Sequence, residues 1–194
     1  MKYWHFLPAD GKLAYEPREI VKVKHTLILP PDTRIIPCNV GFHASARAID
    51  ALQYAPGPIA CIVTLHGTVV SHGNPVDKYA AQGRTVLAMA DATETIRAFS
   101  RWCALSVIHL WDAPQIVYDY LNTGDEKIRA AAGDAAWAAA GDAAWDAARA
   151  AAGDAARAAA RDAAWAAAGA AAKTNQNTQL EKMLNKLLSQ EATK

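Results

Sequence analysis

The sequence lacks several features that would point directly to a class of protein. Its three cysteines, in 194 residues, are widely spaced and include no Cys-x-x-Cys pair. This excludes a disulfide framework and a zinc ribbon, and it favours reduced thiols in a cytosolic protein. No run of 18 apolar residues occurs, and the first residues lack the apolar run of a signal peptide. We therefore expect no membrane span and no membrane partner.

The common catalytic and metal-binding motifs are also missing. The chain has no Walker loop, no Gly-x-Gly-x-x-Gly, no Gly-x-Ser-x-Gly and no His-Glu-x-x-His. The six histidines never pair at helical metal spacing, so we expect no metal site and interpret His109 as a core residue. No residue is nominated as catalytic and no cofactor is expected. Because 20 Lys+Arg nearly cancel 19 Asp+Glu, nucleic acid is an unlikely partner.

Alanine and proline divide the chain into parts of different composition. Of 45 alanines, 28 fall in the 44 residues from Arg129 to Ala172, whereas all nine prolines lie between Pro8 and Pro114. The 52% hydrophobic content therefore overstates the core. We predict a head domain over residues 1–123, a long alanine-rich helix over 124–172, and a polar break followed by a short amphipathic helix over 173–194.

The head domain is predicted to have an α+β fold, a small mixed sheet with two or three helices. Apolar and β-branched runs bounded by turn residues predict strands at Lys2–Leu7 and Lys12–Tyr15 (paired as a hairpin), Ile20–Val23, Thr26–Leu29, Ile59–Leu65 and Thr85–Met89. The polar segment Ser71–Gln82 is predicted to be a surface loop.

Cap residues predict the helices of the head. Ser45 is expected to cap a short helix, Asp91 with Glu94 forms a capping box before a longer one, and Asp112 is expected to cap a third. The longer helix carries one apolar face that we expect to be buried; it consists of Ile96, Phe99, Cys103, Val107 and Leu110. Gly124 stands where a helix end favours a left-handed residue.

The alanine-rich segment has a period of four. From Arg129, every fourth residue is Arg, Gly or Trp, and no proline interrupts the pattern, so we predict one continuous helix. A four-residue step overshoots a helical turn by about 40°, so these residues wind around the helix and form no single stripe. A solvated spacer and close helix–helix packing both remain open. Ice binding is disfavoured because threonine is absent from Gly124 to Lys173.

The last segment has one apolar face with helical spacing: Leu180, Met183, Leu184, Leu187 and Leu188. Such a short helix needs a partner, either the head domain or another copy of the chain. We favour self-association, because the long helix would hold this segment far from the head. Together with Trp137, Trp145 and Trp165, these residues predict a homo-oligomer assembled through C-terminal helices.

One stretch of the head resembles the middle of the ADP-ribosyltransferase fold: Gly41-Phe42-His43-Ala44-Ser45, the segment Ala51 to Tyr54, and Pro58 to Gly67. The resemblance implies a nicotinamide pocket with Ser45 and Tyr54, and a ribose-binding role for His5, so that NAD would be the cofactor. The family's catalytic glutamate has no counterpart, because Glu94 is assigned to a helix cap. An inactive or repurposed scaffold is thus implied as readily as an enzyme.

A resemblance over nearly the whole chain rests on longer motifs. They include Trp4-His5-Phe6-Leu7, Gly41-Phe42-His43-Ala44-Ser45, Asp77-Lys78, Arg101-Trp102-Cys103-Ala104-Leu105 and Val107-Ile108-His109-Leu110-Trp111-Asp112-Ala113-Pro114. With the Ala/Trp/Arg/Asp tail, these motifs look like those of hypothetical proteins of tailed phages and prophages. This implies an accessory protein of the host cytoplasm.

Three functional hypotheses follow. The first is a non-enzymatic accessory protein whose head binds a host or phage macromolecule and whose tail mediates self-association or display. The alternative is a protein that binds NAD or ADP-ribose, active or degenerate. The third, nucleic-acid binding through the four tail arginines Arg129, Arg149, Arg157 and Arg161, is opposed by the five interleaved aspartates.

Overall fold

The computed structural model describes residues 1–14, 18–139 and 155–191, and between 155 and 168 it describes the backbone alone. The chain divides into two compact units. The first unit combines Met1–Ile96 with Asn175–Lys194, and the second comprises Arg97–Thr174. The fold class is α+β, as predicted, because one sheet is followed by helices that include a long C-terminal one.

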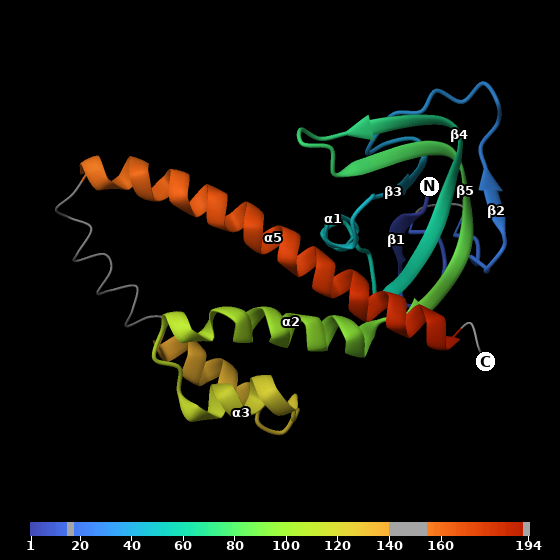
Figure 1. The fold of residues 1–194 in the computed structure, drawn as a ribbon. Coiled ribbons are helices and arrows are strands. Elements are labelled where there is room, and N and C mark those ends of the chain that lie inside the picture. Colours follow the sequence, from blue (N-terminus) through green and yellow to red (C-terminus); the bar gives the residue numbers. More distant parts are fainter. Residues whose placement is uncertain (15–17, 140–154, 192–194) are drawn as a thin grey trace. The chain divides into compact units, whose positions relative to one another are not determined.

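The first unit is built on a five-stranded antiparallel sheet (Figure 1). Its strands are β1 (Tyr3–Leu7), β2 (Thr26–Ile28), β3 (Phe42–Ala44), β4 (Ile59–His72) and β5 (Lys78–Asp91). Their order is β1-β4-β5-β2, and β3 pairs with the first part of β5. The apolar run at Ile59–Leu65 forms the buried half of β4, which lies between two neighbours.

The two long strands bend, and the bend brings β1 and β3 together. The register of β4 shifts between Ile62 and Val63 and again between His66 and Val69, and Gly67 has a φ of 68° in the second shift. Trp4 and Ser45 exchange both backbone hydrogen bonds, at 2.8 and 2.9 Å. Pairing therefore closes a ring through β1, β4, β5 and β3. The core inside it includes Leu7, Val21, Leu27, Ala44, Cys61, Val63 and Val86.

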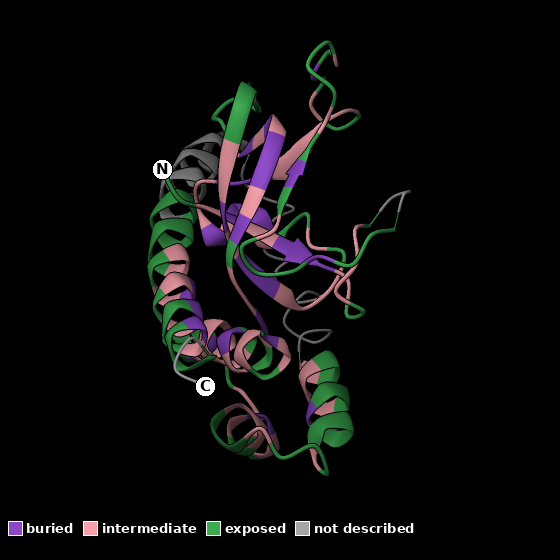
Figure 2. Ribbon diagram, turned by 90° about the vertical axis from the view of Figure 1, so that its right-hand side faces the viewer, coloured by how far each residue is buried: buried purple, intermediate pink, exposed green. Residues whose placement is uncertain are grey.

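The C-terminal helix completes the first unit. Helix α5 runs without a break from Ala155 to Glu191, so the expected polar interruption is absent. Beyond residue 175, its positions Leu180, Leu184 and Leu188 are buried, whereas Met183 and Leu187 are half-buried (Figure 2). The last helical segment therefore packs on the chain's own first unit, and not as an unpartnered helix far from the head.

Helix α1 (Ala48–Leu52) is capped by this distant segment and not by its own sequence. Its first residue is preceded by Arg47, which makes no side-chain cap bond. The N–H of Ala48 donates to Glu181 Oε1 at 3.1 Å, and the N–H of Ile49 donates to Asn177 Oδ1 at 3.0 Å. The prediction of a Ser45 cap is wrong, because the backbone of Ser45 pairs with β1.

The second unit is helical. It contains most of α2 (Thr93–Val107), the 3₁₀ turn η1 (Ile108–Leu110), α3 (Gln115–Thr123), a helix at residues 129–139, and the first part of α5. The rings of Phe99 and Trp102 stack with centroids 6.1 Å apart. As predicted, Gly124 ends α3 with a φ of 69°, and its N–H donates to the carbonyl of Tyr120.

Several predicted elements differ in the structure. The first strand pairs with β4 rather than with Lys12–Tyr15, because the apolar run of β4 offers Phe6 and Leu7 a buried neighbour. The predicted surface loop at Ser71–Gln82 is the tip of the β4–β5 hairpin, with only residues 73–77 between the strands. This half of β4 is largely exposed, so it lacks the apolar periodicity that predicts a strand.

The helix caps and faces of the later head show mixed outcomes. Asp91 accepts a bond from the N–H of Thr93 at 2.8 Å, so its carboxylate binds the first turn of α2, but Ala92 and not Asp91 directly precedes the helix. The third helix is preceded by Pro114, which provides no side-chain bond, so the Asp112 cap is wrong. Because α2 ends at Val107, Leu110 and His109 lie in η1 and are exposed, against the predicted core positions.

Candidate functional site

Two buried cations on β5 define the most unusual site in the first unit. Arg84 is only 2% exposed and Lys78 only 8% exposed. His43 pairs with Ala80, two residues from Lys78, so His43 and Lys78 stand on the same face of the sheet. Arg84 pairs with the core residue Leu27, and His5 pairs with the core residue Cys61, so Arg84 and His5 stand on the opposite, inner face. We call Lys78, His43, Arg84 and His5 the cationic cluster, which is divided between the two faces of the sheet.

Arg84 lies across the junction between β1 and β3. Its Nη1 donates to the backbone carbonyl of His43 at 3.0 Å, and its guanidinium carbon lies 5.5 Å from the centre of the Phe42 ring. The buried Nε has no hydrogen-bond partner. Among the described side chains, no carboxylate lies within ion-pair distance of Arg84 or Lys78. Burial accordingly lowers the pKa of Arg84 to about 10.

The two imidazoles of the cluster are held neutral. His5 donates a hydrogen bond to the backbone carbonyl of His43, yet burial and the neighbouring charge of Arg84 keep its pKa well below the ordinary value. Burial, followed by the charges of Lys78 and Arg84, also lowers the pKa of His43. The Nε2 of His43 accepts the N–H of Cys38 at 3.0 Å, which places the ring proton on Nδ1.

Tyr54 borders the cluster where the chain leaves α1. Its hydroxyl donates to Asp77 Oδ2 at 2.7 Å, and Gln53 Nε2 donates to the same oxygen at 3.1 Å. The ammonium of Lys78 lies 3.7 Å from the centre of the Tyr54 ring, a cation–π contact. The hydrogen bond to Asp77 is the main reason that the pKa of Tyr54 is raised. These contacts attach α1 to the β4–β5 hairpin.

The three residues predicted to form a pocket therefore have different surroundings. His5 lies inside the cluster, and Tyr54, 44% exposed, lies at its Lys78 end. Ser45 is buried and pairs with Trp4, so it faces away from His5, which is the next residue of β1. The structure thus places His5 beside Arg84 on the inner face of the sheet, and Ser45 on the other face, which is that of His43 and Lys78.

Arg84 and its role were missed by the sequence analysis. One signal was present: Arg84 directly precedes the predicted strand Thr85–Met89 and stands two residues before Val86, so a charge was in phase with a buried residue. His43 and Lys78 did belong to the motifs that carried the resemblances, without a role of their own. No group of three or more metal-ligating side chains occurs within residues 1–14, 18–139 and 155–191.

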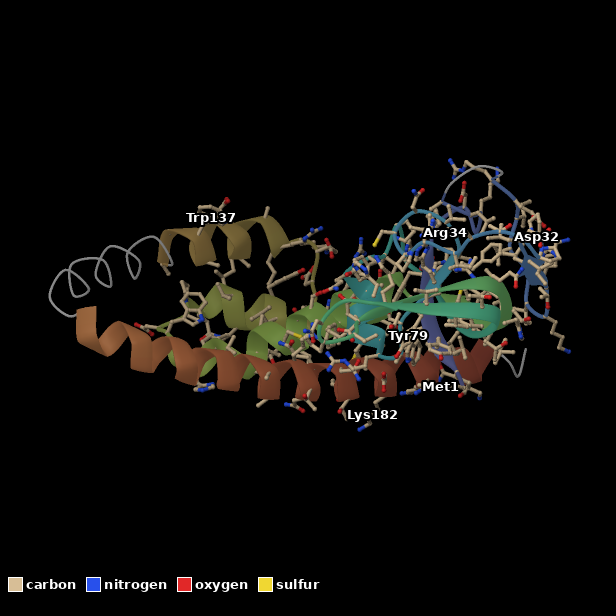
Figure 3. All side chains as sticks on the ribbon, turned by 90° about the horizontal axis from the view of Figure 1, so that it is seen from above. Met1, Asp32, Arg34, Tyr79, Trp137 and Lys182 are labelled. Carbon is tan, nitrogen blue, oxygen red and sulfur yellow. The ribbon has the colours of Figure 1, made fainter. Side chains whose placement is uncertain are left out.

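The residues predicted to mediate self-association also differ from one another. Trp137 is 84% exposed and projects outward from its helix (Figure 3). Trp145 lies outside the described residues, and the side chain of Trp165 is not among those described. Leu180, Leu184 and Leu188 are buried in the first unit and are therefore not displayed to a second copy.

Comparison with family models, curated proteins and solved structures found no match to this chain. Of the helices that the structure describes, none combines the length and the apolar character needed to cross a membrane.

Proposed function

We propose that the chain is a non-enzymatic phage accessory protein, acting in the cytoplasm of the bacterial host, whose first unit binds a host or phage protein. The resemblance of the whole chain to hypothetical proteins of tailed phages and prophages supports this cellular setting. The observation that supports binding is the exposed apolar surface next to edge strand β2, where Ile28 is 70% exposed. Exposed apolar side chains at a sheet edge are typical of interaction surfaces.

The β2 surface consists of Ile20, Lys22, Val23, Lys24 and Ile28. All five side chains are exposed, and the first four line one open hollow together with Glu19 and His25, whose Oε1 and Nε2 atoms lie 3.7 Å apart. The two lysines stand among the apolar residues, so the surface is complementary to apolar side chains flanked by carboxylates. We therefore expect a protein partner with an acidic and apolar segment.

Affinity purification of the full chain from phage-infected host cells tests this surface. The partner should be recovered with the parent chain and lost with Ile28→Asp. Leu110→Asp is the matched control, because Leu110 is also highly exposed but lies in the second unit. Retention of the same partner by Ile28→Asp would contradict the proposed surface.

Self-association through the tail is proposed to depend on the tryptophans rather than on the leucines. Trp137 is the described example, since it contributes no buried surface to the chain itself. Several copies of the head on one assembly would raise its avidity for a repeated target. Light scattering should show an oligomer of the parent chain that shifts toward the monomer in Trp137→Ala. A parent chain that stays monomeric at high concentration would contradict the proposal.

The second candidate is binding of NAD or ADP-ribose, supported by the position of His5 beside Arg84 and that of Tyr54 beside Lys78. Millimolar NAD or ADP-ribose should then raise the melting temperature of the full chain, because the ligand binds only the folded state. Tyr54→Phe keeps the ring and should keep the effect, whereas Tyr54→Ala should reduce it. No shift with either ligand would refute this candidate.

A further inference from the structure

Strand β2 is an edge strand, the last in the order β1-β4-β5-β2 (Figure 1). It pairs with β5, and within the described residues no second strand and no isolated bridge reaches it. Ile28 stands opposite Gly83 of β5, which has no side chain to cover it. The edge of a sheet presents backbone N–H and C=O groups that can pair with a further strand.

The hydrogen bonds to β5 indicate which backbone groups of β2 are free. The carbonyl of His25 and the N–H of Leu29 are hydrogen-bonded to β5, at 3.3 and 2.9 Å. In an antiparallel pair, residues that bond to one neighbour alternate with residues whose backbone groups point to the other side. The N–H and C=O groups of Thr26 and Ile28 therefore point toward the open edge, where they offer two donors and two acceptors.

A positively charged hollow adjoins the N-terminal end of β2. It is lined by residues 19, 20 and 22–25, which directly precede the strand. Lys22 and Lys24 form no ion pair with any residue that the structure describes, whereas Glu19 Oε1 lies 3.7 Å from His25 Nε2. The two lysines can thus bind carboxylates of a partner, and such complementary charges fix the register of an interface.

We propose that β2 binds its partner by strand addition, in which an extended segment of another protein pairs with Thr26 and Ile28 as a further antiparallel strand. This rests on the proposed function, because it concerns the β2 surface, and it adds the mode of binding. In strand addition, backbone hydrogen bonds supply affinity and side chains supply specificity.

The direction of the added strand places its charges. Every strand pair of the sheet is antiparallel, and antiparallel pairing is slightly more stable than parallel pairing. The C-terminal end of an antiparallel segment lies beside the residues that precede β2. The segment is therefore apolar and β-branched next to Ile28, and acidic residues follow it where Lys22 and Lys24 stand.

A synthetic peptide with blocked ends and the sequence Thr-Val-Thr-Val-Thr-Glu-Glu is the probe for the full chain. Hydrogen–deuterium exchange followed by NMR reports each backbone amide. At saturating peptide, the amides of Thr26 and Ile28 should exchange at least tenfold more slowly, whereas the amide of Leu27, which faces β5, should change less. The matched peptide Thr-Val-Thr-Val-Thr-Lys-Lys should bind at least threefold more weakly at low ionic strength, because its charges repel the two lysines.

Two variants of Thr26 isolate the backbone contribution. Thr26→Pro removes an N–H from the open edge, where proline is tolerated, and should weaken binding of the acidic peptide at least tenfold. Thr26→Val keeps the N–H and should bind as the parent does. Both variants lose the 2.7 Å hydrogen bond between the hydroxyls of Thr26 and Thr85, so their difference reports the N–H alone.

The same variants separate this proposal from the proposed function in purification from infected cells. A partner that is lost with Ile28→Asp but retained with Thr26→Pro would leave the β2 surface as the binding site and overturn strand addition. A partner that is retained with Ile28→Asp contradicts the β2 surface itself.

Three further outcomes would overturn strand addition. The first is no binding of the acidic peptide, and the second is binding that leaves exchange at Thr26 and Ile28 unchanged. The third is self-association of the parent chain that Thr26→Pro abolishes, since the added strand would then come from a second copy. If Thr26→Pro does not fold, exchange in the parent chain decides the result alone.

Discussion

The backbone carbonyl of His43 connects three strands of the first unit. It accepts hydrogen bonds from Arg84 on β5 and from His5 on β1, next to the point where Trp4 and Ser45 pair. The side chains of Arg84 and His5 thus add to the backbone pairing that joins β1 to the end of β3. This structural role accounts for the burial of Arg84.

The two cluster histidines make stability depend on pH. Their pKa values are lowered in the folded state, chiefly by burial, whereas in the unfolded chain they are near the ordinary value of about 6.5. Below that pH the two imidazoles bind protons in the unfolded chain, whereas in the folded chain they stay neutral to a lower pH. The free energy of unfolding should therefore have its full value above about pH 6.5. It should decrease as the pH falls toward the folded-state pKa values of the two histidines.

Urea denaturation of the parent chain and of His5→Gln between pH 5 and 8 measures this effect. Glutamine keeps a donor for the His43 carbonyl but does not titrate, so the variant should lose less stability on acidification. An identical dependence on pH in the two proteins would show that His5 is not responsible.

Gly124 is required by its backbone conformation. Its φ is 69°, whereas the guanidinium of Arg101, whose carbon lies 2.6 Å from the position of a Cβ, is the end of a flexible side chain that can move aside. Gly124→Ala should lower the free energy of unfolding by about 1–2 kcal/mol, the usual penalty for a left-handed residue. Gly133 lies in a helix with no atom within 4 Å of its Cβ position. Gly133→Ala should therefore raise the free energy of unfolding by up to about 1 kcal/mol. Urea denaturation measures both variants, and equal effects of Gly124→Ala and Gly133→Ala would contradict this prediction.

At the scale of elements, α1 depends on a segment more than a hundred residues away. An isolated five-residue helix is not stable, and its sequence supplies no cap. Asn177 and Glu181 are one helical turn apart on α5, so both reach the free N–H groups of α1. Helix α1 in turn positions Tyr54 against Asp77 and Lys78.

Removal of these caps should be measurable. Asn177→Ala and Glu181→Ala should each lower the free energy of unfolding by about 0.5–2 kcal/mol, the range for lost N-terminal caps. Lys182→Ala is the control, because Lys182 is exposed on the outer side of α5 (Figure 3). The three variants are compared by urea denaturation, and a Lys182→Ala loss as large as the others would show that the caps are not specific.

Local signals explain which elements could be predicted. The start of α2 just after Asp91, the end of α3 at Gly124 and the buried half of β4 each follow from a short pattern, and the structure confirms them. The partner of β1, the cap of α1 and the burial of Arg84 depend on contacts distant in sequence. No periodicity within a short window encodes such contacts, so the candidate site was identified only in part, through His5 and Tyr54.

At the scale of the whole molecule, the first unit is discontinuous: it needs the last residues of the chain. Leu180, Leu184 and Leu188 are buried in it, although 78 residues of the second unit separate them from Ile96. The composition indicated a head followed by a tail. It could not show that the end of the tail belongs to the head, because an apolar helical face fits an intramolecular and an intermolecular partner equally well.

A chain ending at residue 174 should therefore be strongly destabilised rather than merely shorter. Loss of a single buried leucine side chain costs roughly 2–5 kcal/mol, and this truncation removes three together with both α1 caps. We expect a lower melting temperature, measured by circular dichroism. A synthetic peptide of residues 175–191, added in excess, should restore part of the stability by binding in trans. If the truncated chain has the same melting temperature as the full chain, the C-terminal leucines do not stabilise the first unit and are available for self-association.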